Sequence, residues 1–172
     1  MIPLDRKKWI ERRKQIPDSL RREKESAIAR KVAPYLKGKV AMYHAVRGEV
    51  DLSSYIDEKD AYFPHTEEDT LVFYKETEKK RTGRFGIPEP LPEQAIEPDQ
   101  LDVIVCPVVA FDHTKRIGYG AGYYDRYLPR THALTIGLAF DCQECDDIVW
   151  HESDWELDMM ITETRVLKRR TK

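Results

Sequence analysis

The sequence predicts a single α/β domain of three layers, an open and mostly parallel sheet with helices on both faces. Helix-like and strand-like segments alternate along the chain, and this order is typical of α/β folds. Two apolar runs, 103–107 and 133–140, have the composition of strands that are buried on both faces. A chain of 172 residues fits one domain, 1–172, with a substantial core.

The composition is that of an ordinary soluble domain, with 41% apolar and 35% charged residues. No apolar run approaches about 18 residues, and the N-terminus is charged, so neither a membrane span nor a signal peptide is expected. We therefore expect a cytoplasmic protein without a membrane partner. A monomer is also expected, although no residue pattern indicates the oligomeric state. The cysteines, which lack the second C-x-x-C pair of a zinc site, are expected to be free thiols: Cys106, Cys142 and Cys145.

The net charge of −2 is unevenly spread. Residues 1–40 hold 13 Lys and Arg against 5 Asp and Glu, a net of +8, and the remainder holds 16 against 26, a net of −10. A solvated basic helical face explains this pattern; alternatively, one or two of these cations reach an anionic ligand. Nucleic acid is not expected as a partner, because acids interrupt the basic residues and the pI is about 6.2.

The basic N-terminal part, about 1–37, is predicted to be helical. The first helix is expected over 3–16, with Trp9 and Arg13 at helical spacing on one side. A second helix follows and is expected to end near Pro34, since proline cannot continue a helix without kinking it.

The middle of the chain is predicted to alternate strands and loops. Residues 39–44 are typical of a strand, and Glu49 follows at its carboxyl edge, where ligands of open α/β sheets bind. Taken alone, Glu49 is more simply a capping or surface acid. A helix is expected from near Leu52. Two strands, a polar turn, a proline-stiffened connection and a linker follow at 61–64, 71–74, 75–81, 84–90 and 91–100.

A glycine-rich segment at 116–126 is the densest feature of the sequence. Gly118, Gly120 and Gly122 alternate within it, although the whole chain has only eight glycines. Such a loop lets a ligand approach bare backbone amides, and a helix starting at 123 would add a dipole that favours phosphate. The spacing matches neither a Walker A motif nor the dinucleotide fingerprint. Phosphate binding and a tight packing turn both remain open, and the strand–loop–helix context favours phosphate.

The C-terminal third is predicted to add a short helix at 142–150 and a polar loop at 151–158 that enters a last strand reaching Glu163. The basic end, 168–172, is expected to be a frayed tail. The residues alone do not choose a functional acid among Asp154, Glu156 and Asp158.

The segment Arg-Ile-Gly-Tyr-Gly-Ala-Gly-Tyr-Tyr-Asp-Arg-Tyr-Leu at 116–128 strongly resembles the signature of the 5-formyltetrahydrofolate cyclo-ligase, or methenyltetrahydrofolate synthetase, family. The strand and loop at 103–112 match the segment that leads into that signature. The resemblance runs from Arg6, whose spacing to a following Arg-Arg-Lys run matches the family, to Glu163. One departure is Ile2, which stands where the family usually has a lysine.

The resemblance implies the α/β fold predicted above and an ATP- and Mg²⁺-dependent ligase. The reaction would convert 5-formyltetrahydrofolate to 5,10-methenyltetrahydrofolate through phosphorylation of the formyl oxygen, with release of ADP and phosphate. No catalytic nucleophile is implied, and Arg116 and Tyr123 would position the reactants. The alternative is a non-catalytic nucleotide- or folate-binding relative of the same family, which Ile2 favours.

The resemblance also implies binding residues. ATP would contact Arg6, Arg116, Ile117, Gly118, Tyr119, Gly120, Ala121, Gly122, Tyr123 and Tyr124. The folate would contact His44, Glu49, Tyr119, Gly120, Ala121, Gly122 and Tyr123. Glu49 would accept hydrogen bonds from the pterin, since a carboxylate matches a pair of N–H groups. Asp125 and Asp158 would bind Mg²⁺, which prefers a few hard oxygens shared with phosphate. Without the resemblance, Asp125 is as readily an acid that complements a helix dipole.

Overall fold

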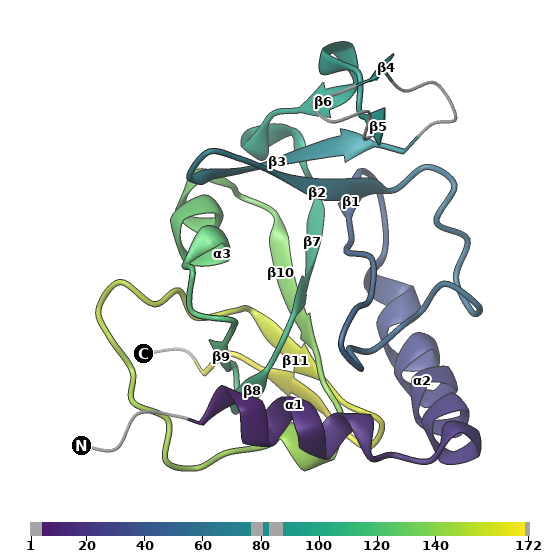
Figure 1. Ribbon diagram of the computed structural model, residues 1–172, viewed down its shortest axis with the longest axis vertical. Helices are drawn as coiled ribbons and strands as arrows, with labels where there is room; N and C mark the ends of the chain where they lie inside the picture. The colour runs from purple at the N-terminus through teal and green to yellow at the C-terminus, as the bar shows by residue number, and fades with distance from the viewer. Residues whose placement is uncertain (1–4, 77–80, 83–87, 171–172) are drawn as a thin grey trace.

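The computed structural model describes residues 5–76, 81–82 and 88–170, which form an eight-stranded sheet with helices packed around it (Figure 1). The strand order is β12-β11-β10-β7-β1-β2-β3-β6. The bounds of these strands in chain order are β1 Val40–Ala41, β2 Tyr62–Glu67, β3 Thr70–Lys75, β6 Ala95–Ile96, β7 Val103–Pro107, β10 Leu134–Leu138, β11 Met159–Ile161 and β12 Val166–Lys168. Two further hairpins pair β4 Arg81–Thr82 with β5 Pro88–Glu89, and β8 Ala110–Asp112 with β9 Lys115–Ile117.

The centre of the sheet is parallel and its edges are antiparallel. Strands β11, β10, β7, β1 and β2 are parallel neighbours. At one edge β12 pairs antiparallel with β11, and at the other β3 pairs antiparallel with β2 and β6. The predicted open, mostly parallel sheet is therefore confirmed. Parallel strands bring their carboxyl ends to one edge of a sheet, and ligands of α/β folds bind there.

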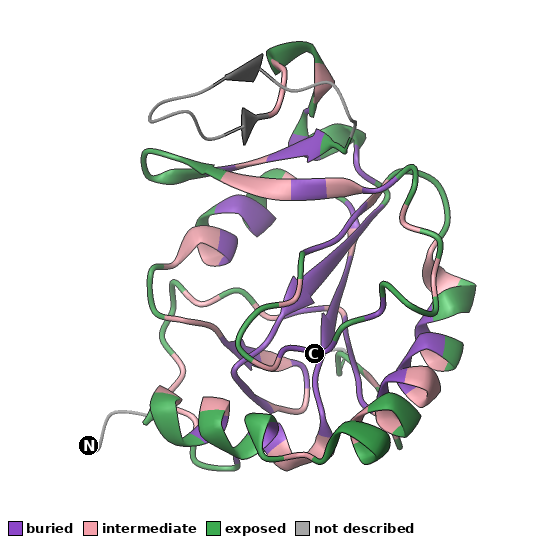
Figure 2. Ribbon diagram, turned by 45° about the vertical axis from the view of Figure 1, so that its right-hand side comes forward, coloured by how far each residue is buried: buried purple, intermediate pink, exposed green. Residues whose placement is uncertain are grey.

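Helices cover both faces of this sheet, as predicted. Helix α2 (Asp18–Val32) packs Ile28 and Val32 on the face that includes Val105 and Ile136. The short helix α3 (Tyr123–Tyr127) packs on the opposite face, against Ile104 and its neighbours. Successive residues of β7 serve the two cores because side chains alternate along a strand. Figure 2 shows the result, with the central strands buried and the helices exposed on their outer sides.

Helix α1 (Arg6–Lys14) lies beside the β8–β9 hairpin (Figure 1). Its apolar side packs Trp9 against Val109, Ile117 and Cys145. The Asp5 carboxylate caps the helix by accepting a hydrogen bond from the Lys8 amide at 3.3 Å. Both predicted N-terminal helices are present. The second ends at Val32 and continues as a 3₁₀ turn at Ala33–Tyr35, where its end was predicted.

Two predicted helices are wrong. The chain after Leu52 forms only a turn, because the Asp51 and Asp57 carboxylates accept hydrogen bonds from backbone amides two residues on and so compete with helix formation. At 142–150 the structure has one 3₁₀ turn, Asp141–Gln143. The chain then leaves it, since the Cys145 amide donates to the Phe111 carbonyl at 2.7 Å.

Two segments are more ordered than predicted. The expected linker at 91–100 contributes β6, which pairs with β3 at the sheet edge. Lys168, expected to begin a frayed tail, pairs with Met159 as the last residue of β12. The β8–β9 hairpin was not predicted at all. Most of the predicted turn at 75–81 and connection at 84–90 lie outside the described residues, as does Ile2.

Candidate functional site

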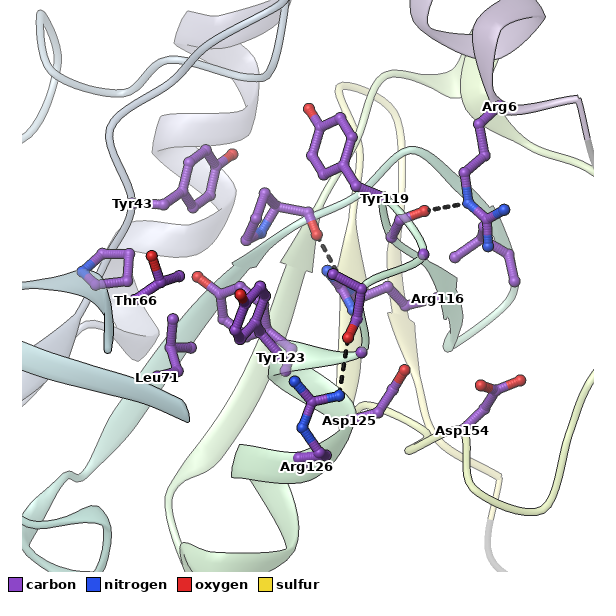
Figure 3. A pocket seen from close by; sticks show the side chains of 18 of the residues that line it. Arg6, Tyr43, Thr66, Leu71, Arg116, Tyr119, Tyr123, Asp125, Arg126 and Asp154 are labelled. Atoms are coloured by element: carbon purple, nitrogen blue, oxygen red, sulfur yellow. Dashed lines mark hydrogen bonds between the residues drawn. The ribbon is translucent and has the colours of Figure 1, made fainter. Parts of the chain in front are cut away.

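A cavity of about 1150 Å³ lies between the glycine-rich loop, the carboxyl ends of β1 and β7, and the β2–β3 hairpin (Figure 3). It collects segments from across the whole sequence. Every residue predicted to bind ATP or folate lines it: Arg6, His44, Glu49, Arg116, Ile117, Gly118, Tyr119, Gly120, Ala121, Gly122, Tyr123 and Tyr124. Of the two predicted metal ligands, Asp125 lines it and Asp158 does not.

The glycines of the loop at 118–122 meet two different requirements. Gly120 (φ +102°) and Gly122 (φ +75°) occupy the left-handed region that glycine tolerates and side chains rarely adopt. Gly118 has an ordinary φ, but a Cβ there would lie 2.6 Å from the Arg116 guanidinium. The glycine pattern therefore allows both the turn and the close approach of an arginine.

The backbone amides of the glycine loop are available as hydrogen-bond donors. Within the part of the chain that the structure describes, no amide from Gly118 to Gly122 donates a hydrogen bond to another residue. Gly118, Tyr119 and Gly122 are half-buried and Gly120 and Ala121 are exposed, so these donors are open to water or to an acceptor-rich ligand in the cavity. Helix α3 has only five residues, so the loop amides contribute more to this site than a helix dipole does.

Two arginines border these amides. Arg6 Nε donates to the Gly118 carbonyl oxygen at 2.7 Å, and Arg116 Nε donates to the Pro107 carbonyl oxygen at 2.6 Å (Figure 3). Arg116 is buried, and its guanidinium lies 4.9 Å from the centre of the Tyr124 ring. Each guanidinium is fixed through Nε, and among the described residues its terminal nitrogens have no hydrogen-bond acceptor. Both side chains can therefore donate to an anion in the cavity.

Glu49 is buried on the other side of the cavity with both carboxylate oxygens in use. Its Oε1 accepts from the Val46 amide at 2.9 Å, and its Oε2 accepts from the Tyr119 hydroxyl at 2.7 Å. The loop that carries Glu49 turns through Arg47 (φ 51°) and Gly48 (φ 78°). Burial, and then the hydrogen bond to Glu49, raise the pKa of Tyr119, so its hydroxyl remains a donor at neutral pH.

His44 lies at the opening of the cavity. Its ring stacks on Phe63, with centroids 3.9 Å apart and planes 4° from parallel. Its Nε2 is 3.5 Å from the Glu76 carboxylate. The stacked ring is a flat surface held in place, which suits contact with a planar ligand.

The aspartates divide between the cavity and the sheet. Asp125 and Asp154 both line the cavity, and their carboxylates accept from the amides of Trp155 (3.1 Å) and His151 (2.8 Å) (Figure 3). Asp158 instead joins β10 to the start of β11, where its Oδ2 accepts from the Thr135 amide and hydroxyl at 2.9 and 3.0 Å. The described residues contain no group of three or more His, Cys, Asp or Glu placed to hold a metal ion on its own.

Several cavity contacts were missed from the sequence. Arg126 donates to the carbonyl oxygens of Ala121 (2.8 Å) and Asp69 (2.9 Å), so it fastens the glycine loop to the β2–β3 turn. Arg13 reaches the Tyr119 hydroxyl at 2.6 Å from helix α1. Its spacing from Trp9, on the side that faces the protein, is the sequence signal that could have found it.

Fold and site together define an α/β protein with an arginine-lined cavity and a glycine loop at the carboxyl edge of its parallel strands. The sequence profile of the 5-formyltetrahydrofolate cyclo-ligase family matches residues 4–163. The chain belongs to this family, and it is a ligase. The family resemblance recognised from the glycine-rich segment is confirmed.

Named relatives agree with this assignment. The chain is 32% identical to 5-formyltetrahydrofolate cyclo-ligase of Escherichia coli K12 over 143 residues, covering 74% of this chain and 79% of the relative. It is 26% identical to the Mycoplasma pneumoniae cyclo-ligase, covering 92% and 96%. The solution structure of Aquifex aeolicus 5,10-methenyltetrahydrofolate synthetase superposes with a TM-score of 0.79 at 30% identity, covering 97% of this chain and 92% of that one. No helix among the described residues is long and apolar enough to cross a membrane.

Proposed function

We propose that the protein converts 5-formyltetrahydrofolate to 5,10-methenyltetrahydrofolate with ATP and Mg²⁺, releasing ADP and phosphate. The main support is the row of amides at Gly118–Gly122, which donate to no other residue that the structure describes and share one cavity with Arg6, Arg116 and Glu49. Donors and cations on one side suit a triphosphate, and a buried carboxylate on the other suits the N–H groups of a pterin. The names of the relatives support the same reaction.

The chemistry needs positioning rather than a side-chain nucleophile. The oxygen of an N-formyl group is a poor leaving group. Transfer of the γ-phosphoryl group of ATP to that oxygen makes it a good one, and N10 of the folate then attacks the formyl carbon and expels phosphate. The tasks left to the protein are alignment of the two substrates and neutralisation of charge.

The cavity residues divide these tasks. The amides from Gly118 to Tyr124 hold the triphosphate, and Arg6 and Arg116 offset its charge. Arg116 and Tyr123 align the γ-phosphoryl group with the formyl oxygen. Glu49 accepts hydrogen bonds from the pterin, and the stacked His44 ring lies beside it. A folate would thus be held next to the phosphoryl group that activates it.

The donor set fits a magnesium ion. Mg²⁺ takes one or two carboxylates together with phosphate oxygens and water, and Asp125 and Asp154 supply two carboxylates in this cavity. When bound, the ion would neutralise the negative charge of the nucleotide phosphates. Asp158, the second ligand predicted from the resemblance, lies outside the cavity lining and bonds Thr135, so we propose Asp154 in its place.

The test is the near-ultraviolet absorbance of the methenyl product. The purified protein, mixed with 5-formyltetrahydrofolate, should produce this absorbance with MgATP and not without it. Binding of both ligands without product would identify a non-catalytic relative, and failure to bind either would reject the assignment of the cavity.

A further inference from the structure

A buried arginine joins helix α1 to the folate side of the cavity. Arg13 is 0% exposed, and all three guanidinium nitrogens donate hydrogen bonds. Nε donates to the Arg47 carbonyl oxygen at 2.9 Å, Nη1 to the Val108 carbonyl oxygen at 2.8 Å and Nη2 to the Tyr119 hydroxyl at 2.6 Å. Among the described residues this cation forms no direct ion pair. A buried charge in that position is costly unless a countercharge lies near.

The Tyr119 hydroxyl supplies the link to a countercharge. It accepts from Arg13 and donates to Glu49 Oε2 at 2.7 Å, so cation and carboxylate are joined through one oxygen atom. Charge-assisted hydrogen bonds of this kind are shorter and stronger than neutral ones. Glu49 is therefore held at Oε2 by this chain and at Oε1 by the Val46 amide.

Arg13 also fixes the loop on which Glu49 stands. Its Nε holds the carbonyl of Arg47, and Arg21 Nη1 holds the carbonyl of Gly48 at 2.9 Å. Arg47 and Gly48 are the two residues of this loop with left-handed backbone. One buried side chain thus restrains both the backbone before Glu49 and the carboxylate itself.

We propose that Arg13 is a positioning residue for the folate and acts through the Tyr119 hydroxyl to orient Glu49. The proposal rests on the proposed function, in which Glu49 binds the pterin. Tyr119 belongs to the glycine loop, so the chain from Arg13 to Glu49 joins the folate side of the cavity to the nucleotide side. Removal of any member should weaken folate binding more than nucleotide binding.

The experiment is a double-mutant cycle read by equilibrium binding. 5-Formyltetrahydrofolate is titrated without nucleotide into the wild type, Arg13→Met, Tyr119→Phe and the double variant, and a non-hydrolysable ATP analogue is titrated separately. Each single change should raise the folate Kd about tenfold, the scale of one charge-assisted bond. Both changes break the same series of hydrogen bonds. The folate Kd of the double variant should therefore be less than about twice that of the weaker-binding single variant. The Kd of the ATP analogue should change less than about threefold, because Tyr119→Phe keeps the backbone amide that is proposed to contact the triphosphate.

Matched variants separate this role from a general loss of packing. Arg12→Met removes the same charge from the next position of α1, where the side chain is exposed and lies over Trp9, and should leave the folate Kd unchanged. If Arg13→Met does not fold, Arg13→Lys takes its place in the double-mutant cycle. The lysine keeps the positive charge but cannot make all three hydrogen bonds of the guanidinium. The proposal would be overturned if the double variant raised the folate Kd by the product of the two single effects. It would also be overturned if the Kd values for folate and for the ATP analogue rose equally. A wild type that binds no folate would reject the proposed function as well.

Discussion

Asp125, Asp154 and Asp158 differ in what their carboxylates already bind. Asp125 and Asp154 each accept one backbone amide and face the cavity. Asp158 accepts two hydrogen bonds from Thr135 through one oxygen and returns one through its own amide. A residue engaged in this way links β10 to β11. The two cavity aspartates keep oxygens that a bridging cation can use.

Asp125→Asn should cut turnover at least tenfold and leave the free energy of unfolding nearly unchanged. The variant keeps an oxygen for the Trp155 amide but loses the charge that Mg²⁺ requires, and changes around metal ligands typically cost about 10–100-fold. Steady-state rates at several Mg²⁺ concentrations measure the effect. In the same assay Asp154→Asn should raise the Mg²⁺ concentration needed for turnover more than Asp158→Asn does. The reverse order would show that Asp158, and not Asp154, is the second metal ligand.

Tyr127→Phe should change the free energy of unfolding by between zero and a gain of about 1 kcal/mol. The Tyr127 hydroxyl is buried and lacks a hydrogen-bond partner in the described structure, so its removal sacrifices no bond. Tyr43→Phe is the matched control, because that buried hydroxyl donates to the Val50 carbonyl oxygen at 2.8 Å and its loss should cost about 1 kcal/mol. Urea unfolding measures both. A cost for Tyr127→Phe equal to that of Tyr43→Phe would refute the prediction.

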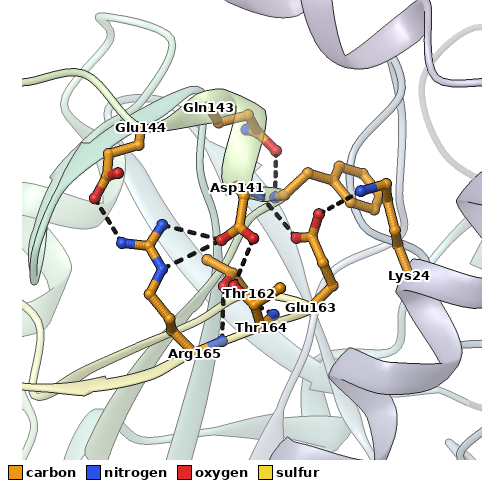
Figure 4. A network of polar contacts seen from close by, with 9 residues as sticks. Lys24, Asp141, Gln143, Glu144, Thr162, Glu163, Thr164 and Arg165 are labelled. Atoms are coloured by element: carbon orange, nitrogen blue, oxygen red, sulfur yellow. Dashed lines mark hydrogen bonds and ion pairs between the residues drawn. The ribbon is translucent and has the colours of Figure 1, made fainter.

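At the scale of elements, a polar network fastens the carboxyl ends of β10 and β11 to helix α2 (Figure 4). Lys24 Nζ lies 2.7 Å from Glu163, whose other oxygen accepts from the Asp141 amide at 2.8 Å. The Asp141 carboxylate pairs with Arg165 at 2.9 Å, and Arg165 reaches Glu144 at 2.8 Å. The network therefore holds the segments that follow β10 and β11 close to each other and to α2.

The protein should lose stability in acid, partly because the Asp141 carboxylate becomes protonated. Partial burial raises the pKa of its carboxyl, but hydrogen bonds from Thr162, Thr164 and Arg165 outweigh it and hold the pKa below its ordinary value. A lowered pKa contributes stability that is present above the unfolded-state pKa, about 4, and is lost as pH falls through the folded value. Asp141→Asn should therefore be less stable at pH 7 and lose less on acidification. Unfolding curves from pH 7 to about 2 measure both, and parallel pH profiles would contradict the prediction.

Sequence patterns predicted the elements whose signal is local. The periodic side of α1 and the apolar runs of β7 and β10 appear where expected, because burial on a helix face or in a sheet centre leaves a clear pattern. The helix expected after Leu52 failed because Asx turns compete with it. The β8–β9 hairpin and β6 are too short to carry a period of their own, so their pairing is decided by tertiary contacts.

Some residues of the candidate site could be predicted from the sequence, and others could not. The glycine spacing marked the loop directly, and the resemblance supplied Arg6 and Glu49, which the structure brings into the same cavity. Neither Arg13 nor Asp154 was chosen. The spacing of Arg13 from Trp9 indicates a side chain that faces the protein but not what it contacts, and Asp154 is one of several acids in a polar loop. Only the fold places them.

At the scale of the whole molecule, the cavity unites the chain's distant parts. Helix α1, the loop after β1, the β2–β3 hairpin, the glycine loop and the segment around Asp154 all contribute to its lining (Figures 1 and 3). The oligomeric state stays a prediction. Sedimentation or light scattering would measure the oligomeric state directly.

The central claim is that the amides of the glycine loop bind the triphosphate. The backbone ¹⁵N–¹H signals of Gly118, Gly120 and Gly122 test it, followed by NMR while a non-hydrolysable ATP analogue with Mg²⁺ is added. We predict that these signals shift strongly and in proportion to occupancy, while those of remote residues such as Gly38 remain in place. Unshifted loop signals at saturating analogue, in a protein that still forms the methenyl product, would contradict the account.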